Sequence, residues 1–499
     1  MIRLLSGIAL AIYAFLQFYS IPYSPLPWFD EVFFADISYN LYKNGTFIPQ
    51  VAIFQPEYSY GFVHFLFAAL SFKFLGFGLI AYRWLNYLFG ALVVWMWLKI
   101  LQKEQPISQD SQPFWALLLL CDPLFNLSMH EGRMDLTALF FMLLGIYFVQ
   151  DKQAINWKNI IFSAVCIALA LLTTPRIGFL LIALGGYWIY YLFLNWRKNF
   201  FLLIGWCLII FLLYSIWVRY AFGSYYAFLN YYLGDTQWKI YKTYLGFSGY
   251  IPKQSYLLIT VSIFSMLIVF FFALKTQTYK AFYAFIVASI VSFYVIVYDL
   301  GPYSIFIIPF YYFWIAKISH LQTNFLPKWV FALPAIGLFF FNLSYFSLKN
   351  IQIFTSLAQR SPAHAEAFVR KHIPPKSRVV SEPMYYYAVK RAGSEMQFMN
   401  YFEELEQREH RQRTKWQYEY LIVTEHLLWR DKPTVSYYFS KADFEPIAHL
   451  HIPQNSFSRW LDAQGWLSTT ERTGYNAIIY KRIPTNPEIP KPLLAKLCK

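Results

Sequence analysis

The sequence predicts a polytopic α-helical membrane protein with a soluble domain at its C-terminal end. Of its 499 residues, 58% are hydrophobic and only 14% are charged, whereas a soluble protein has about 25% charged residues. Long apolar runs recur up to about residue 346, and about 20 apolar residues suffice for an α-helix to cross a bilayer. After Asn350 the composition becomes that of a soluble protein.

Charge and cysteine usage narrow the class of protein. The net charge of +15 does not indicate a nucleic-acid-binding protein, because most basic residues of the first two-thirds flank apolar segments, where they act as topology signals. Three of the four cysteines lie in apolar runs and the fourth is one residue from the end. This arrangement gives no disulfide framework.

The apolar segments divide the first 349 residues into about eleven predicted spans. The run from Leu4 to about Phe18 is predicted to be an uncleaved first span with a cytoplasmic N-terminus, because no small-residue cleavage site follows it. The other spans are expected at about 82–101, 114–130, 135–150, 158–174, 177–194, 200–218, 255–274, 281–298, 303–318 and 329–346.

The run 61–79 could be a twelfth span or a helix at the membrane surface. If it does not cross, five turns that hold at least two basic residues each, such as Lys99 with Lys103, face the cytoplasm. If it does cross, all of these turns face outward, against the positive-inside rule. We therefore expect 61–79 on the outer surface, within one external loop from about 20 to 81. A second external loop is expected at 219–254.

Residues 350–499 are predicted to form an extracytoplasmic α/β or α+β domain. Helices are expected from Ala363 to His372 and from Met384 to Arg391, because Pro374 and Gly393 follow them. Strands are expected at 377–382, 418–424 and 476–480. The domain contains no nucleotide-binding glycine loop, no zinc-ligand spacing and no G-x-S-x-G motif.

Two adjacent carboxylates, Asp30 and Glu31, follow the first span and lie among aromatic residues. Ionisable groups at membrane depth cost about 2.5–3.5 kcal/mol each, so a chain this apolar is expected to keep them for a function. The alternative interpretation is a solvated helix N-cap, with Asp30 starting a helix that runs to about Tyr42.

Other charged residues are expected at the same outer surface. Arg133 and Arg176 fall on turns that the positive-inside rule leaves without basic residues, close to Asp135 and Pro175 in the sequence. They could instead reach lipid phosphates by snorkelling. The loop 219–254 interleaves aromatic residues with basic ones, as a lipid-binding or sugar-binding surface or an ordinary aromatic belt would.

The ordered motifs resemble those of GT-C membrane glycosyltransferases, specifically the family-39-like branch related to protein O-mannosyltransferases and the lipid A aminoarabinose transferase. The resemblance covers about residues 1–346. It rests on Asp30-Glu31 after the first span, a Phe74-Leu75-Gly76 turn leading to 81–86, Gly132-Arg133-Met134-Asp135-Leu136, and the Tyr303-to-Pro309 segment. The sequence departs from the family at Gln55-Pro56 and at Pro302, which leaves the sugar and the phosphate contacts open.

The resemblance implies transfer of a sugar from a polyprenyl-phosphate donor to a lipid, glycan or protein acceptor at the outer face of a bacterial plasma membrane. Asp30 would be the base, Glu31 would support it, and Asp135 would hold the acceptor or share a divalent metal (Mg²⁺, Mn²⁺ or Zn²⁺) with Asp30. The residues expected to bind the donor phosphate are Arg83, Arg133, Arg176, Lys239 and Lys242, and those expected to bind substrate are His64 and Tyr303.

Two other function classes remain open at this point. A transporter or lipid flippase would show inverted repeats or broken helices near the membrane midplane, and the sequence indicates neither. A non-catalytic membrane scaffold would bind a partner through its external domain. Replacement of Asp30 distinguishes these classes, because a scaffold tolerates the change and an enzyme does not.

Overall fold

The structure is a computed structural model, and it describes most of the chain as helices with a small C-terminal sheet. The residues described are 2–51, 61–104, 107–150, 156–194, 196–230, 253–275, 281–296, 303–321, 327–399, 418–430, 435–436, 438–439, 442–464 and 474–483. The chain divides into two compact units, each described by itself. Unit 1 comprises residues 1–17, 55–67 and 83–348, and unit 2 comprises residues 18–54, 68–82 and 349–499.

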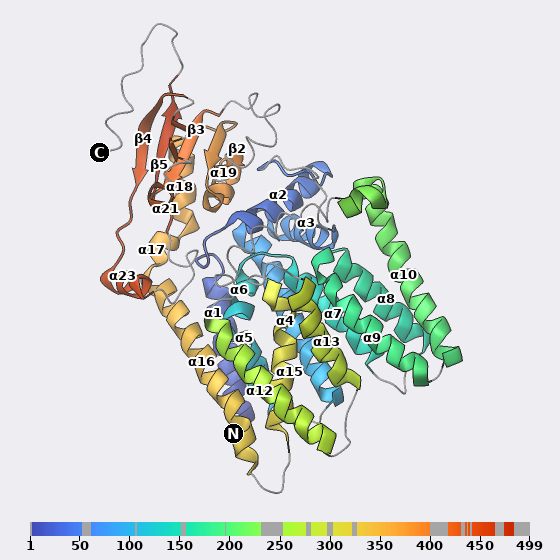
Figure 1. Ribbon diagram of the computed structural model, residues 1–499. Coiled ribbons are helices and arrows are strands. Elements are labelled where there is room, and N and C mark those ends of the chain that lie inside the picture. Colours follow the sequence, from blue (N-terminus) through green and yellow to red (C-terminus); the bar gives the residue numbers. More distant parts are fainter. Residues whose placement is uncertain are drawn as a thin grey trace. The chain divides into compact units, whose positions relative to one another are not determined.

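Helices make up the described part of unit 1 (Figure 1). Helices α1, α3, α4 and α16 contribute residues to both units. The helices with residues in unit 1 are α1 (Ile2–Ser20), α3 (Val63–Leu75), α4 (Leu79–Glu104), α5 (Gln112–Leu120), α6 (Pro123–His130), α7 (Asp135–Val149), α8 (Trp157–Leu171), η1 (Pro175–Gly178), α9 (Phe179–Leu194), α10 (Trp196–Phe222), α12 (Lys253–Lys275), α13 (Ala281–Ile296), η2 (Ser304–Phe306), α15 (Ile308–Ser319) and α16 (Lys328–Thr355).

Within the described residues, four helices are long and apolar enough to cross a membrane, and a fifth span results if the bent pair α6 and α7 is counted as one. The four are Leu79–Glu104, Phe200–Phe222, Tyr256–Ala273 and Trp329–Thr355, and other apolar helices are shorter. Large apolar side chains stand exposed on α10 and α12, for example Ile216 (69%) and Phe271 (63%). Such exposure is unfavourable in water but suits a lipid-facing surface. The prediction of a polytopic helical membrane protein is confirmed, whereas the number of about eleven spans stays a prediction.

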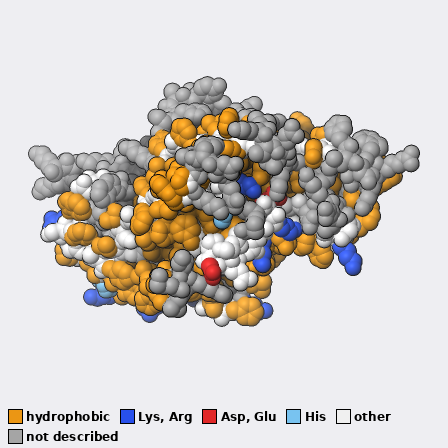
Figure 2. Space-filling view, turned by 90° about the horizontal axis from the view of Figure 1, so that it is seen from below, with side chains coloured by type: hydrophobic (Ala, Val, Ile, Leu, Met, Phe, Trp, Pro, Cys, Tyr) orange, Lys and Arg blue, Asp and Glu red, His pale blue; other side chains and the backbone are white. Residues whose placement is uncertain are grey.

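One face of the molecule illustrates this composition. On the described surface in Figure 2, hydrophobic side chains cover large areas, with basic side chains scattered between them and acidic side chains at few places. The buried core of the helices is likewise apolar and rich in aromatic side chains. Lipid and protein are similarly apolar, so polar contacts between the helices gain importance for fixing their arrangement.

The segment expected to be one span at 114–130 is in fact two helices. Helix α5 ends at Leu120 and α6 begins at Pro123, with Asp122 as the N-cap residue that accepts hydrogen bonds from the backbone N–H groups of Leu124 and Phe125, 3.0 Å each. Proline at the first helical position suits this break, because its missing N–H is not needed there. The Asp122-Pro123 pair was the sequence signal for a second helix start, and the apolar run on both sides of it obscured that signal.

A buried polar network holds this break to distant helices. The hydroxyl of Tyr312 on α15 donates to Asp122 Oδ2 at 2.9 Å. The amide of Asn342 on α16 donates to Tyr312 Oη at 2.7 Å and to the carbonyl of Leu118 at 3.0 Å. All three side chains are fully or nearly fully buried, so the network satisfies groups that would otherwise be costly in an apolar surrounding.

The C-terminal part of unit 2 is a five-stranded mixed sheet with helices packed on it (Figure 1). The strand order is β2-β1-β3-β5-β4, in which β1 is parallel to β2 and β3, while β5 is antiparallel to β3 and β4. The elements are α17 (Leu357–Arg360), α18 (Pro362–His372), β1 (Arg378–Ser381), η3 (Pro383–Tyr385), α19 (Tyr386–Arg391), β2 (Glu395–Phe398), β3 (Tyr420–Thr424), α21 (Glu425–Arg430), β4 (Phe444–Leu450), α23 (Ser456–Ala463) and β5 (Ala477–Arg482).

The helices and strands expected in this domain are confirmed, with small shifts of their ends. Strand β3 is buried at every position, as its apolar run predicts. Strands β2 and β4 were not predicted. The exposure of most of β4 explains the miss, since a half-exposed edge strand carries little apolar signal.

The same unit includes α2 (Phe29–Asn44), which lies in the predicted external loop. Asp36 of α2 is fully buried. Its carboxylate accepts a hydrogen bond from the Tyr386 hydroxyl at 2.9 Å and lies 3.7 Å from Lys390 Nζ, both on α19. It also accepts the backbone N–H of Val51 at 3.0 Å and that of Gln50. One buried carboxylate therefore joins α2, the segment that follows it and the C-terminal sheet domain.

We predict that Asp36→Ala strongly destabilises unit 2. The substitution leaves the nearly buried Lys390 ammonium (6% exposed) without its carboxylate, and breaking a buried pair in this way costs about 3–5 kcal/mol. Glu366→Ala is the matched control, since it breaks the 2.7 Å pair with the half-exposed Arg391, and such pairs are worth about 0–1 kcal/mol. Thermal unfolding of the purified protein measures both. Equal, small shifts in the two variants would show that the Asp36 contacts do not hold the unit together.

Candidate functional site

The candidate site in unit 1 is built at the sharp turn between α6 and α7, whose axes differ in direction by 115°. Gly132 lies in this turn with a φ of +64°, a backbone conformation that glycine adopts without the steric cost of a side chain. Asn86 of α4 donates to the backbone carbonyls of Ser128 at 3.2 Å and Arg133 at 2.8 Å. The turn is thus fixed from a neighbouring helix, and Arg133 and Asp135 project from it.

Arg133 and Asp135 form a buried ion pair. Arg133 Nε lies 2.5 Å from Asp135 Oδ2, and each side chain is only 3% exposed. Asp135 is the first residue of α7, where the helix dipole favours a negative charge. A charge in an apolar surrounding is tolerated only when it is paired. Each of the two residues here compensates the charge of the other.

Tyr303 brings a second arginine to this pair. The guanidinium carbon of Arg133 lies 4.8 Å from the centre of the Tyr303 ring, and that of Arg176 lies 4.3 Å from the same centre. Tyr303 immediately precedes η2, which packs against α6 and α7, and Arg176 belongs to η1. Cation–π contact accounts for both positions. Two guanidinium groups therefore lie against one aromatic ring.

The start of α3 contacts the chain just before η1 and also contacts α7. The backbone N–H of Val63 donates to the carbonyl of Leu172 at 3.2 Å. At Gly61 a Cβ atom would lie only 1.7 Å from that carbonyl oxygen, so only glycine allows the approach. His64 is fully buried, and its Nδ1 lies 3.0 Å from Thr137 Oγ1 of α7. His64 of α3 therefore contacts α7 two residues after Asp135.

Asp30 and Glu31 lie in unit 2, in the first turn of α2. The N-cap residue is Trp28, and its side chain makes no capping hydrogen bond, so the alternative interpretation of Asp30 as the N-cap is wrong. Glu31 is fully buried, whereas Asp30 is half-buried. Tyr82 lies within electrostatic range of both carboxylates. The more accessible Asp30 fits contact with a substrate, and the enclosed Glu31 fits a supporting role.

The remaining predicted site residues are placed as follows. Arg83 is fully buried on α4, one turn before Asn86 and hence on the same side of the helix. Lys239 and Lys242 lie outside the described residues, as does most of the loop 219–254. Asn86 was not predicted as a site residue. It is the last residue of the Ala81-to-Asn86 motif, and its place in that motif could have identified it. Asp122, Tyr312 and Asn342 carried no such signal.

A metal shared by Asp30 and Asp135 stays a prediction. Asp30 belongs to unit 2 and Asp135 to unit 1. Asp135 already neutralises Arg133 at 2.5 Å, and a carboxylate engaged in this way is a poor partner for a second cation. The function proposed below therefore uses no metal.

Fold and site together define a multi-pass helical membrane protein with a C-terminal mixed-sheet domain, in which two arginines lie against the Tyr303 ring beside a buried carboxylate. No family model and no curated protein matches the sequence. The chain does share its fold with a solved protein, ArnT from Cupriavidus metallidurans. The crystal structure of ArnT bound to undecaprenyl phosphate matches with a TM-score of 0.57 and 10% identity, over 95% of this chain and 97% of that one. The apo crystal structure matches with a TM-score of 0.53 and 11% identity, over the same shares. The resemblance predicted from the motifs is thereby confirmed as a likeness of fold.

Proposed function

We propose that the protein is a membrane glycosyltransferase that takes its sugar from a polyprenyl-phosphate donor. The observation that carries the proposal is the convergence of Arg133 and Arg176 on the Tyr303 ring. Two guanidinium groups against one ring are placed to attract an anion, and arginine binds phosphate with geometric specificity through its planar fork.

The shared fold supports a lipid-linked phosphate as this anion. The matching ArnT structure, by its description, is bound to undecaprenyl phosphate. A polyprenyl chain needs an apolar surrounding, which the helices of this protein provide in excess. The proposal therefore assigns Arg133 and Arg176 to the donor phosphate, with Tyr303 holding both side chains in place and Asp135 orienting Arg133.

In the proposed reaction the acceptor oxygen attacks the anomeric carbon of the donor sugar. The bond between that carbon and the phosphate oxygen breaks, and polyprenyl phosphate leaves with the electron pair. Fixed positive charge stabilises the leaving group as its negative charge develops. The acceptor proton passes to Asp30, which we assign as general base. Arg83, His64, Lys239 and Lys242 remain predicted contributors, and the sugar and the acceptor are left open.

Replacement of Arg176 tests the phosphate assignment. We expect Arg176→Ala to weaken binding of undecaprenyl phosphate at least about thirtyfold, since loss of a partner for a desolvated charge costs about 2–5 kcal/mol. Arg176→Lys should restore binding only in part, because lysine lacks the planar fork. Equilibrium binding to the purified protein in lipid nanodiscs measures this.

Arg219→Ala is the matched control for this experiment. Arg219 is exposed at the end of α10 and donates to the carbonyl of Gly223 at 2.6 Å. This contact is local and lies far from Tyr303 in the sequence. Removal of the Arg219 side chain should leave binding unchanged. If Arg176→Ala binds the lipid as tightly as the Arg219→Ala protein, Arg176 does not hold the donor phosphate. The alternative interpretation, in which Arg176 reaches phosphates of membrane lipids by snorkelling, would then be favoured.

Replacement of Asp30 tests the chemistry itself. Asparagine keeps the shape of aspartate but cannot accept the proton, so Asp30→Asn should lower sugar transfer by at least about a hundredfold. Folding and donor binding should stay as in the wild type. Glu31→Gln should slow transfer less, because a supporting residue sets geometry alone. The readout is turnover with a panel of polyprenyl-phosphate sugars, and transfer at the wild-type rate by Asp30→Asn would exclude Asp30 as the general base.

A further inference from the structure

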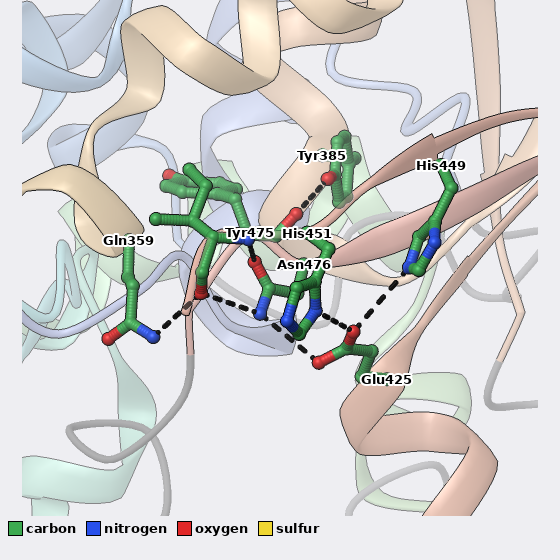
Figure 3. Close-up of polar contacts among 8 residues, drawn as sticks. Gln359, Tyr385, Glu425, His449, His451, Tyr475 and Asn476 are labelled. Atoms are coloured by element: carbon green, nitrogen blue, oxygen red, sulfur yellow. Dashed lines mark hydrogen bonds and ion pairs between the residues drawn. The ribbon is translucent and has the colours of Figure 1, made fainter. Parts of the chain in front are cut away.

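Three metal-ligating side chains of unit 2 meet at one corner of the C-terminal sheet. Glu425 opens α21 directly after β3, His449 belongs to β4, and His451 follows β4. In Figure 3 both imidazole rings turn toward the carboxylate of Glu425. The residues were not identified from the sequence, because a glutamate more than twenty positions from an H-x-H pair forms no recognised ligand spacing.

The register of the sheet brings these residues together. Thr424 of β3 pairs with Ala477 of β5, and Ala477 pairs in turn with Leu450 of β4. The next residues along the three strands are Glu425, Asn476 and His451, so they continue the same row. His449 lies two residues before His451 and hence on the same side of the strand.

The donor atoms already lie near the spacing that a metal ion requires. His451 Nδ1 is 2.8 Å and His449 Nε2 is 3.5 Å from the same Glu425 Oε1. The three ligand atoms all lie within 4.8 Å of one another. In a tetrahedral zinc site with bonds of about 2.0–2.1 Å, ligand atoms are about 3.3 Å apart. Small rotations of the side chains therefore suffice to surround one ion.

Asn476 binds the Glu425 carboxylate at the oxygen that does not face the histidines. Its side-chain amide donates to Glu425 Oε2 at 3.1 Å and to the carbonyl of Ile452 at 3.1 Å. Its side-chain oxygen accepts the N–H of Ile452 at 2.9 Å, and its carbonyl accepts the N–H of Glu425 at 3.0 Å. Such partners orient a ligand and tune its affinity in known metal sites. One oxygen of Glu425 is thus fixed, and the other faces the two histidines.

We propose that Glu425, His449 and His451 form a binding site for a borderline divalent transition metal, with Zn²⁺ as its representative. Two imidazoles and one carboxylate favour such a metal over Mg²⁺ and Ca²⁺, which prefer oxygen ligands alone. Three protein ligands leave a fourth position open to water or another ligand. All three side chains are exposed by a third or more, so the ion can exchange with the surroundings. A bound ion would tie the end of β3 to the end of β4 across β5.

The test is zinc titration of the full-length protein, purified without a polyhistidine tag and stripped with a chelator. We expect one Zn²⁺ to bind per chain at this site, with X-ray absorption at the zinc edge showing nitrogen and oxygen ligands that include two imidazoles. His449→Ala, His451→Ala and Glu425→Gln should each weaken this binding by at least about tenfold. Excess Mg²⁺ or Ca²⁺ should not displace the ion.

His364→Ala is the matched control, because His364 is also an exposed histidine of this unit. Its ring Nδ1 lies 2.8 Å from the backbone carbonyl of Ala358, a local contact. The His364→Ala protein should bind zinc like the wild type. Thermal unfolding in chelator checks that every variant is folded. No binding by the wild type, or binding that stays unchanged in folded His449→Ala and His451→Ala proteins, would overturn the proposal and leave the cluster as surface hydrogen bonds.

Discussion

The candidate site in the helical unit depends on the need to neutralise a buried arginine. Arg133 is almost completely enclosed, and Asp135 compensates its charge from 2.5 Å away at the start of α7. That pair in turn requires the sharp turn between α6 and α7, which Gly132 permits and Asn86 holds by two hydrogen bonds. Tyr303 and Arg176 complete the arrangement through ring contacts. The elements of the site are thus connected to one another through Arg133.

A buried charge with partners from several segments also holds unit 2 together. Asp36 is enclosed on α2, and its partners come from α19 and from the backbone of Gln50 and Val51. The backbone N–H of Phe398 at the end of β2 donates to the carbonyl of Val51 at 2.9 Å, which extends the connection. The C-terminal sheet domain is thus fastened to the helix that carries Asp30 and Glu31. This gives the C-terminal sheet domain a physical role in positioning the helix that carries those carboxylates.

Much of the fold could be predicted from the sequence, because apolar runs and turn residues are local signals. The four long apolar helices, the strand β3 and the helix ending before Pro374 belong to this class. The motif around Arg133 and Asp135 and the Tyr303-to-Pro309 segment, which the structure brings together, were also recognisable. What escaped prediction depends on residues distant in the chain. The Asp122–Tyr312 hydrogen bond joins positions 190 apart, and the two contacts of Asn342 reach as far as Leu118. Asn86 and the Glu425 cluster likewise acquire their roles only when strands or helices pack together.

The central claim is that Arg133 and Arg176 converge to hold the phosphate of a polyprenyl lipid. The most direct measurement is a cryo-electron microscopy structure of the full chain in nanodiscs with undecaprenyl phosphate. The account predicts phosphate density within hydrogen-bond distance of both guanidinium groups, with Tyr303 still in contact with them. A phosphate bound elsewhere, with both arginines still engaged only by protein groups, would contradict it.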